Sequence, residues 1–99
     1  MAEAVRRLVQ MFAPDRIYLF GSRARGDARP DSDWDLMVIL PESAEPKIRR
    51  AQRAHLALAG VRLPVDILVW TRKEFDWQAQ ASASLPATIL REGRVLYAA

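Results

Sequence analysis

Three aspartates are the residues of this chain best suited to metal and phosphate chemistry. Asp33 and Asp35 stand two residues apart before five apolar residues, and Asp66 lies inside a second apolar run, Val65–Trp70. Side chains on a strand alternate between its faces, so we expect Asp33 and Asp35 to point to one side and Trp34 to the other. Neighbouring carboxylates repel one another unless a cation lies between them. Oxygen ligands of this kind suit Mg²⁺ or Mn²⁺ better than zinc.

Gly21 and Ser22 offer the features that a metal-bound polyphosphate also needs. They follow Arg16–Phe20, a short and mostly apolar run that we interpret as a buried strand. A Gly-Ser turn at the end of such a strand presents backbone N–H groups and a hydroxyl to an anion. Arg23 and Arg25 come next and are candidate contacts to a triphosphate, with ordinary surface arginines as an equally weighted alternative.

Asp66 is the informative carboxylate, because an unpaired charge inside an apolar strand costs several kcal/mol unless something offsets it. If the strands of Asp35 and Asp66 are neighbours, Asp33, Asp35 and Asp66 can share two metal ions. One ion would activate an attacking hydroxyl, and the other would bind a triphosphate and stabilise the leaving pyrophosphate. A structural ion pair of Asp66 with Arg62 or Arg16 is the alternative.

Composition indicates a small globular protein with one domain, residues 1–99. The chain is 51% hydrophobic and 27% charged, with a net charge of +3, which is compatible with an anionic substrate but too weak to establish nucleic-acid binding. It has no cysteine, which excludes disulfides and thiolate metal sites. The first residues, MAEAVRRLVQMF, lack the continuous apolar core of a signal peptide, and no apolar run approaches membrane-spanning length, so we expect a soluble, cytoplasmic protein without a membrane partner.

Apolar periodicity predicts helices interleaved with short strands. The expected order is a helix over Glu3–Phe12, a strand over Arg16–Phe20, a helical turn over Ser22–Gly26, a loop over Asp27–Ser32, a strand from Asp33 or Trp34 to Pro41, a helix over Glu42–Ala59, a strand over Val65–Trp70, a helix from Thr71 to about Gln80, a helix over Leu85–Glu92 and a strand over Arg94–Tyr97. This order indicates an α+β, or mixed α/β, fold with a small mixed sheet of three to four strands flanked by helices.

The longest expected helix, over Glu42–Ala59, has an apolar side and a basic side. Pro46 is expected in its first turn, and Gly60 is expected to close it. We assign the inner face to Ile48, Ala51, His55 and Leu58, and the outer face to Arg49, Arg50, Gln52 and Arg53. The following helix is expected to begin at a capping box formed by Thr71 and Glu74.

Taken together, these motifs resemble the polymerase-β-like nucleotidyltransferase superfamily. Its signature is a hydrophobic residue with Gly-Gly or Gly-Ser, about ten residues, an Asp-x-Asp or Asp-x-Glu pair among hydrophobic residues, and a later carboxylate between hydrophobic residues. Here these segments are Phe20-Gly21-Ser22, Asp33-Trp34-Asp35-Leu36 and Val65-Asp66-Ile67. Within the superfamily the chain is most similar to the minimal nucleotidyltransferase (MNT) proteins, through GSRARG, SDWDL and the closing ILREGRVLY.

This resemblance implies a nucleotidyltransferase that transfers AMP, or another nucleoside monophosphate, from ATP to a hydroxyl. MNT proteins commonly pair with an all-helical HEPN toxin, so the resemblance implies an antitoxin that adenylylates a tyrosine of such a partner. By the same analogy Gly21 and Ser22 hold the β- and γ-phosphates, Asp33 and Asp35 bind two Mg²⁺ ions, and Asp66 helps to deprotonate the acceptor. Asp66 is also counted among the expected metal ligands, and Mn²⁺ is the alternative ion.

Two further functions stay open at this point. The protein could be a non-catalytic antitoxin that neutralises a HEPN partner by forming a complex, or it could transfer the nucleotide to RNA or a small molecule. Arg50 and His55 repeat the Arg-x4-His pattern of HEPN ribonucleases, but that motif belongs to an all-helical fold. We therefore interpret His55 as a packed helix residue and the nearby arginines as a solvated face, with RNA or partner contact as the alternative. The acceptor and the homo- or hetero-oligomeric state stay open.

Overall fold

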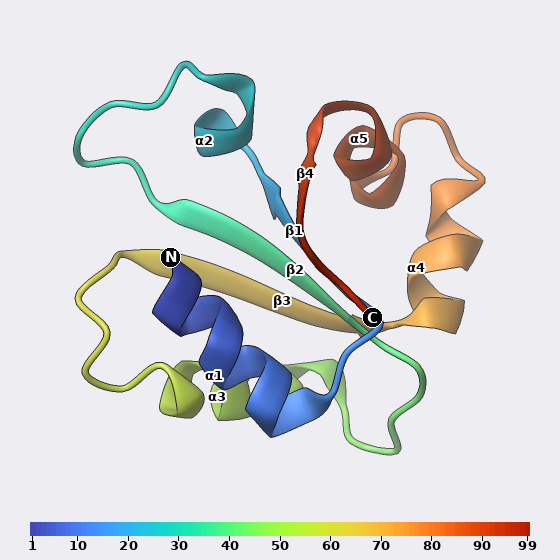
Figure 1. The fold of residues 1–99 in the computed structure, drawn as a ribbon. Coiled ribbons are helices and arrows are strands. Elements are labelled where there is room, and N and C mark those ends of the chain that lie inside the picture. The colour runs from blue at the N-terminus through green and yellow to red at the C-terminus, as the bar shows by residue number, and fades with distance from the viewer.

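A computed structural model describes residues 1–99 as a four-stranded mixed sheet with helices on both faces (Figure 1). The elements are α1 (Ala2–Phe12), β1 (Arg16–Phe20), α2 (Ser22–Arg25), β2 (Trp34–Leu40), α3 (Lys47–Ala57), β3 (Val65–Thr71), α4 (Arg72–Ala79), α5 (Leu85–Glu92) and β4 (Arg94–Ala98). The mixed α+β class is therefore confirmed, and every strand lies within a residue or two of its predicted bounds. No helix has the length and apolar character needed to cross a membrane.

The sheet has the strand order β3-β2-β1-β4, with β3 and β4 at its edges. β1 runs antiparallel to β2 and β4, whereas β2 and β3 are parallel. The parallel register places Asp35 directly beside Asp66, and the antiparallel register places Asp35 beside Phe20. The condition stated from the sequence for Asp35 and Asp66 to share metal ions, that their strands are neighbours, is met.

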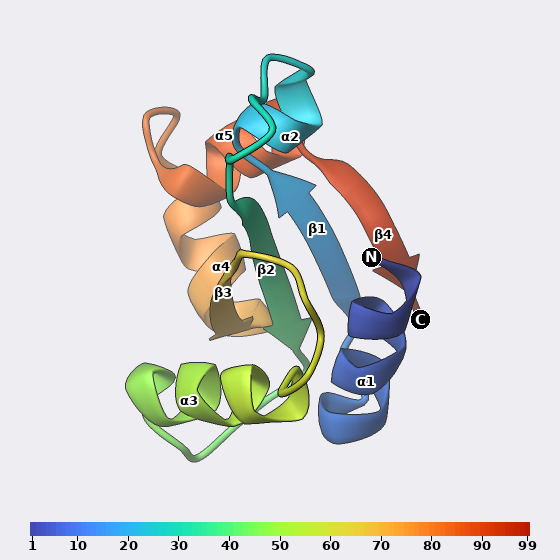
Figure 2. The ribbon, with the colours of Figure 1, turned by 90° about the vertical axis from the view of Figure 1, so that its left-hand side faces the viewer.

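Each face of the sheet has its own apolar layer, because the strand side chains alternate. One face packs against α1 and α3 through twelve buried residues, among them Leu8, Leu36 and Leu58. The other face packs against α4 and α5, where Phe75 stacks on Tyr18 with ring centroids 6.0 Å apart. Figure 2 shows α4 and α5 together on the left of the strands and α1 on the right.

The helix α3 begins later than predicted, because the residues before it form a turn. Pro46 is the N-cap residue with extended backbone (φ −63°, ψ 154°), and a residue before proline disfavours the helical conformation. The Ser43 hydroxyl accepts the N–H of Glu45 over 3.1 Å, which stabilises this turn. At the other end α3 stops at Ala57, and Gly60 lies in the turn that follows with φ of 85°.

The inner face of α3 also differs from the prediction. Ile48 is 69% exposed and His55 is exposed, whereas Arg50, Ala54 and Leu58 are buried at a spacing of four residues. The interpretation of His55 as a packed residue, and of Arg50 as a surface residue, was therefore wrong. The helix is rotated about its axis relative to the predicted orientation because a guanidinium group, not an isoleucine, occupies its inner side.

Arg50 is only 3% exposed and joins α3 to the two elements that follow it. Its Nε donates to the carbonyl of Glu45 over 2.9 Å, and its Nη1 donates to the carbonyl of Val69 over 3.1 Å. Its guanidinium also forms a two-pronged ion pair with the Glu74 carboxylate, at 2.8 and 3.3 Å. Because every bond of this buried charge goes to a fixed partner, Arg50 is a structural residue and is not available to a ribonuclease-like site.

Glu74 in turn completes the capping box predicted at the start of α4. Its carboxylate accepts the N–H of Thr71 over 2.7 Å, while the Thr71 hydroxyl accepts the N–H of Glu74 over 3.2 Å. The hydrogen bonds from Arg50, and then those of Thr71, lower the pKa of Glu74 from 4.5 to about 2. One carboxylate therefore serves both the helix cap and the buried arginine.

We predict that Arg50→Ala lowers the free energy of unfolding by about 3 kcal/mol, because it leaves two carbonyls and the Glu74 carboxylate without their buried donor. The measurement is urea denaturation followed by circular dichroism. Arg49→Ala is the matched control: Arg49 is exposed, and its removal should change stability by less than about 0.5 kcal/mol. Equal effects of the two substitutions would contradict this account.

We also predict an acid-sensitive contribution to stability from Glu74. A carboxyl whose pKa is lowered on folding stabilises the fold above its unfolded pKa of 4.5, and this contribution is lost as the pH falls through about 2. Glu74→Gln keeps a side chain that can accept at the helix cap but removes the charge. The difference in unfolding free energy between wild type and Glu74→Gln should therefore be largest near neutral pH and vanish near the lower pKa. A difference that stays constant with pH would exclude this role.

Candidate active site

The candidate site lies at the end of the sheet where β1 finishes and β2 and β3 begin. In Figure 1, α2 and the loop after it stand over this end, so the chain between β1 and β2 encloses it from above. Asp35, Asp66 and the first residue of α2, Ser22, all come to this end of the sheet. The parallel alignment of β2 and β3 thus gathers residues that are far apart in the sequence.

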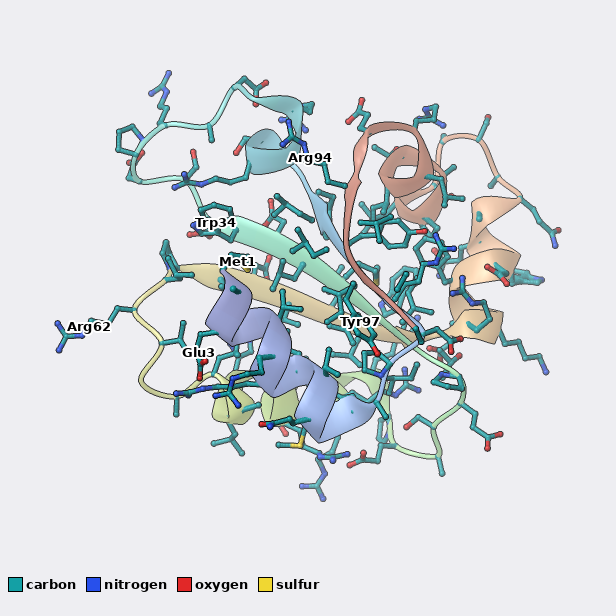
Figure 3. All side chains as sticks on the ribbon, viewed as in Figure 1. Met1, Glu3, Trp34, Arg62, Arg94 and Tyr97 are labelled. Carbon is teal, nitrogen blue, oxygen red and sulfur yellow. The ribbon has the colours of Figure 1, made fainter.

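Asp35 and Asp66 are register partners, so their side chains leave the same face of neighbouring strands. Asp66 is exposed, and the premise that it is buried in an apolar strand was wrong: it stands at the open start of an edge strand. It makes no ion pair. Figure 3 shows Arg62 extending away from the protein, and Arg16 lies at the far end of β1, so neither partner considered from the sequence is used.

The carboxylates at this end of the sheet act on one another electrostatically. Partial burial raises the pKa of Asp35, and the negative charges of Asp66 and Asp33 raise it further, while Arg25 lowers it. The charges of Asp33 and Asp66 both act on Asp35, so Asp35 lies within electrostatic range of the other two predicted carboxylates. An excess of negative charge that disfavours ionisation of Asp35 is the condition under which a cation would be bound favourably.

Gly21 approaches the Asp35 carboxylate so closely that any side chain at this position would displace the carboxylate. A Cβ on Gly21 would lie 2.2 Å from Asp35 Oδ2 and 3.2 Å from Asp35 Cγ. The φ of Gly21 is also 73°, a conformation that residues with a side chain rarely adopt. The glycine of the motif therefore has two physical reasons here: it turns the chain from β1 into α2, and it leaves room for the carboxylate.

α2 is a single turn that presents its first backbone amides toward the site. The N–H groups of Ala24 and Arg25 both donate to the carbonyl of Gly21 over 3.1 Å. The N–H groups of Ser22 and Arg23 precede these bonds and have no acceptor within the helix. These amides and the Ser22 hydroxyl are suited to phosphate oxygens, as the sequence motif suggested.

Arg23 and Arg25 differ in what they contact. Arg23 donates to the carbonyl of Ser32 over 2.9 Å, and its guanidinium lies 4.5 Å from the centre of the Trp34 ring. This side chain therefore holds the loop between α2 and β2 and is committed to that role. Arg25 is exposed and pairs with Asp27 over 3.3 Å, and its charge reaches Asp35, so of the two it is the better placed to meet an anionic ligand.

The donor set fits a divalent cation through carboxylate oxygens, but no group of three acidic, histidine or cysteine side chains is arranged to hold a metal ion by itself. In phosphoryl-transfer sites Mg²⁺ is usually held by one or two carboxylates together with phosphate oxygens and water, and not by a protein cage. Asp35 and Asp66, in register, provide such a pair, and Asp33 lies one residue before β2. The residues therefore suit an ion that arrives with a nucleotide.

Comparison with known proteins identifies the class to which this chain belongs. Residues 1–96 match the family described as nucleotidyltransferase domain, so the chain belongs to that family. The family predicted from the Gly-Ser and aspartate motifs is thereby confirmed, and the similarity to proteins of the MNT type is supported by two relatives.

Two curated relatives are named as protein adenylyltransferases. MntA of Haemophilus influenzae is 29% identical over 75 residues, covering 75% of this chain and 66% of its own length. MJ0141 of Methanocaldococcus jannaschii is 36% identical over 55 residues, covering 56% of this chain and 54% of its own length. The present chain thus matches about two thirds of the first relative and about half of the second.

Solved structures share the fold. A Sulfolobus solfataricus protein assigned to the nucleotidyltransferases superposes with a TM-score of 0.66 at 23% identity, over 97% of this chain and 75% of its own. A toxin–antitoxin complex solved with AMP-PNP gives a TM-score of 0.66 at 23% identity, over 99% and 73% of the two chains. The MntA–HpeT toxin–antitoxin, as a mutant with two aspartates changed to glutamates, gives 0.63 at 21%, over 99% and 72%. At these identities the likeness shows the fold alone.

We predict that Gly21→Ala weakens Mg²⁺-dependent ATP binding at least tenfold, about 1.4 kcal/mol, because the new methyl group must displace the Asp35 carboxylate. Gly26→Ala is a matched control, since Gly26 also has a positive φ (86°) but nothing lies within 4 Å of its Cβ position. Gly26 has left-handed backbone (φ 86°, ψ 11°), so Gly26→Ala should cost about 1 kcal/mol of stability. Gly21→Ala should cost more, about 1–3 kcal/mol, because φ 73° with ψ −157° is a conformation that essentially only glycine adopts, so binding is compared where both variants are folded. Isothermal titration calorimetry would measure the binding, and equal affinity in the two variants would contradict the crowding at Gly21.

Proposed function

We propose that this protein is a metal-dependent adenylyltransferase that transfers AMP from ATP to a protein hydroxyl. The proposed acceptor is a tyrosine of a HEPN-type toxin, and the transfer would make this chain an antitoxin. The observation that carries the proposal is that Asp35 pairs in register with Asp66 while Gly21 lies close to the Asp35 carboxylate. That arrangement brings a phosphate-binding turn and a carboxylate pair to one end of the sheet.

The reaction proposed is a displacement at the α-phosphorus of ATP. The acceptor oxygen forms a bond to that phosphorus while the bond to the oxygen bridging the α- and β-phosphates breaks, and pyrophosphate leaves with the bridging oxygen. The hydroxyl proton passes to a carboxylate and then to water. Asp66 suits this last task, because it is exposed, unpaired and beside Asp35.

The remaining residues bind and orient the nucleotide. The amides of Ser22 and Arg23 and the Ser22 hydroxyl would bind the β- and γ-phosphates, and Arg25 would offset their charge. Asp33 and Asp35 would hold Mg²⁺ ions, with Asp66 as a third ligand. Bound Mg²⁺ would neutralise the carboxylates, activate the acceptor and stabilise the leaving pyrophosphate.

Two findings about relatives support the choice of ATP and of a toxin as acceptor. Both curated relatives are named for protein adenylyl transfer, and one structural neighbour is a toxin–antitoxin complex with the ATP analogue AMP-PNP. The MntA–HpeT mutant carries its two substitutions at aspartates separated by one residue, the same spacing as Asp33 and Asp35. We propose the same reaction class for this chain and locate it, as a working hypothesis, in the cytoplasm.

We predict that Asp35→Asn lowers AMP transfer at least about 100-fold while leaving the fold unchanged, because the amide removes the charge that binds the cation and keeps the shape. The assay follows transfer of α-labelled ATP to the purified toxin, with protease and nuclease digestion of the product. Asp31→Asn, in the exposed loop, is the control and should keep full activity.

The outcomes separate the open alternatives. Protease-sensitive label that depends on Asp35 supports the proposal, whereas nuclease-sensitive label would indicate transfer to RNA. If the wild type neutralises the toxin without labelling it, and Asp35→Asn neutralises it equally well, the protein is a binding antitoxin and the proposed chemistry is wrong. Full activity of Asp35→Asn would also overturn the assignment.

A further inference from the structure

We infer that the groove between α3 and the outer edge of β3 is the docking site for the toxin, which lies there as an extended segment added to the sheet beside β3. The inference deepens the proposed function and rests on it for the identity of the partner. It names the surface through which an acceptor hydroxyl would reach Asp66. Neither the family match nor any relative assigns a role to this surface.

The groove has a volume of about 730 Å³ and runs along the strand edge. Asp66 and Leu68, from one face of β3, and Ile67, from the other, all line it, so it follows the outer side of the strand and not one face of the sheet. Its second wall is α3, where Ile48 and Leu56 are 69% and 73% exposed. Two large apolar side chains left this exposed, about two turns apart on one helix, indicate a contact surface.

The groove contains one of the candidate catalytic carboxylates, and this separates it from the other apolar surface of the molecule. A groove of about 570 Å³ between α1 and β4 is also apolar, but it includes none of the three aspartates. In the α3–β3 groove the apolar wall ends at Asp66. A chain bound along the wall would therefore bring its side chains directly to the site.

The backbone of β3 favours a polypeptide as the occupant. β3 is an edge strand, and the carbonyl of Val69 points outward, because it accepts Arg50 and not a group of β2. Backbone groups two residues apart on a strand point the same way, so the N–H and C=O of Ile67 also point outward. An extended segment can pair with these groups and place alternate side chains against Ile48 and Leu56.

Only the half of the β3 edge that lies next to the candidate site has backbone groups free to pair with another strand. At the other half, Arg50 occupies the carbonyl of Val69 and the Glu74 carboxylate occupies the N–H of Thr71. The unpaired stretch therefore begins at Val65 and ends before Val69, with Asp66 inside it. This limits an added strand to a few residues and fixes it beside the carboxylate pair.

The groove also favours a protein segment over a triphosphate, because its polar lining residues are Gln52, His55 and Asp66 and no lysine or arginine lines it. The exposed side chains of Ile48 and Leu56 offer no hydrogen-bonding partner or positive charge to a triphosphate, whose suitable amides lie on α2. A protein segment with an apolar residue beside its hydroxyl-bearing residue matches both the wall and Asp66. The two substrates would thus approach the site from different sides.

The test is titration of the purified toxin into three versions of this protein, with binding measured by isothermal titration calorimetry. The double substitution Ile48→Asp/Leu56→Asp should weaken toxin binding at least tenfold. Leu90→Asp makes the same change at a side chain 56% exposed on α5 and outside the groove, and it should bind as the wild type does. Mg²⁺-ATP affinity, measured separately, should be equal in all three, and circular dichroism checks the fold.

A second readout is hydrogen exchange of the complex. The amide of Ile67 should become protected on toxin binding, whereas that of Leu68, which faces β2, should change little. Unchanged toxin affinity of the double variant, no protection at Ile67, or no toxin binding by the wild type would each overturn the docking site. Binding that depends on the groove without any AMP transfer would support the docking site and overturn the proposed reaction.

Discussion

The parallel pairing of β2 and β3 is the constraint on which the rest of the structure depends. Two parallel strands cannot be joined by a tight turn, so the chain must cross back over the sheet before β3 begins. α3 is this crossover, and Arg50 fixes it to the carbonyl of Val69 and to Glu74 at the start of α4. The register that follows from this crossover is what puts Asp35 beside Asp66.

The same register gathers negative charge at one end of the sheet. Asp35 is disfavoured as an ion by partial burial and by its two carboxylate neighbours, and Arg25 offsets only part of this effect. The strand ends tolerate the arrangement because Asp66 is exposed and because the apolar layers begin one residue further along each strand. A cation that arrives with a polyphosphate would be attracted by these carboxylates and would remove the repulsion between them. The repulsion that is unfavourable without a ligand would therefore contribute to ligand affinity.

Much of the architecture could be predicted because it depends on local patterns. Strands of unbroken apolar residues, the Thr71–Glu74 capping box and the helix that ends before Gly93 were all predicted from spacing and were confirmed. The family also followed from the sequence. The adjacency of the strands that carry Asp35 and Asp66 did not follow from it and was stated only as a condition. The roles of the site residues and their metal ions stay predictions, because they depend on ligands and not on the fold.

The errors about which side chains are buried share one physical cause, which is that burial depends on partners distant in the sequence. An arginine on a helix looks like a surface residue, and only the position of Glu74, 24 residues later, makes it favourable to bury Arg50. With Arg50 turned inward, Ile48 and His55 lie outward, whereas Leu58 is buried as predicted; the missed ion pair therefore changed part of the predicted inner face of α3. Asp66 was misjudged for a related reason: the sequence shows its apolar neighbours but not that its strand forms the edge of the sheet.

This rotation of α3 has a functional consequence that an apolar inner face would not have produced. An unpaired strand edge is a liability, because any other strand can pair with it. Here the Arg50–Glu74 pair satisfies one half of the edge of β3, while the side chains that Arg50 turned outward border the other half. The interaction that secures the fold therefore also restricts edge pairing to the stretch containing Asp66. A buried ion pair often adds little net stability compared with apolar residues of similar volume. Such a pair can still be favoured when it determines which part of a strand edge stays free to pair.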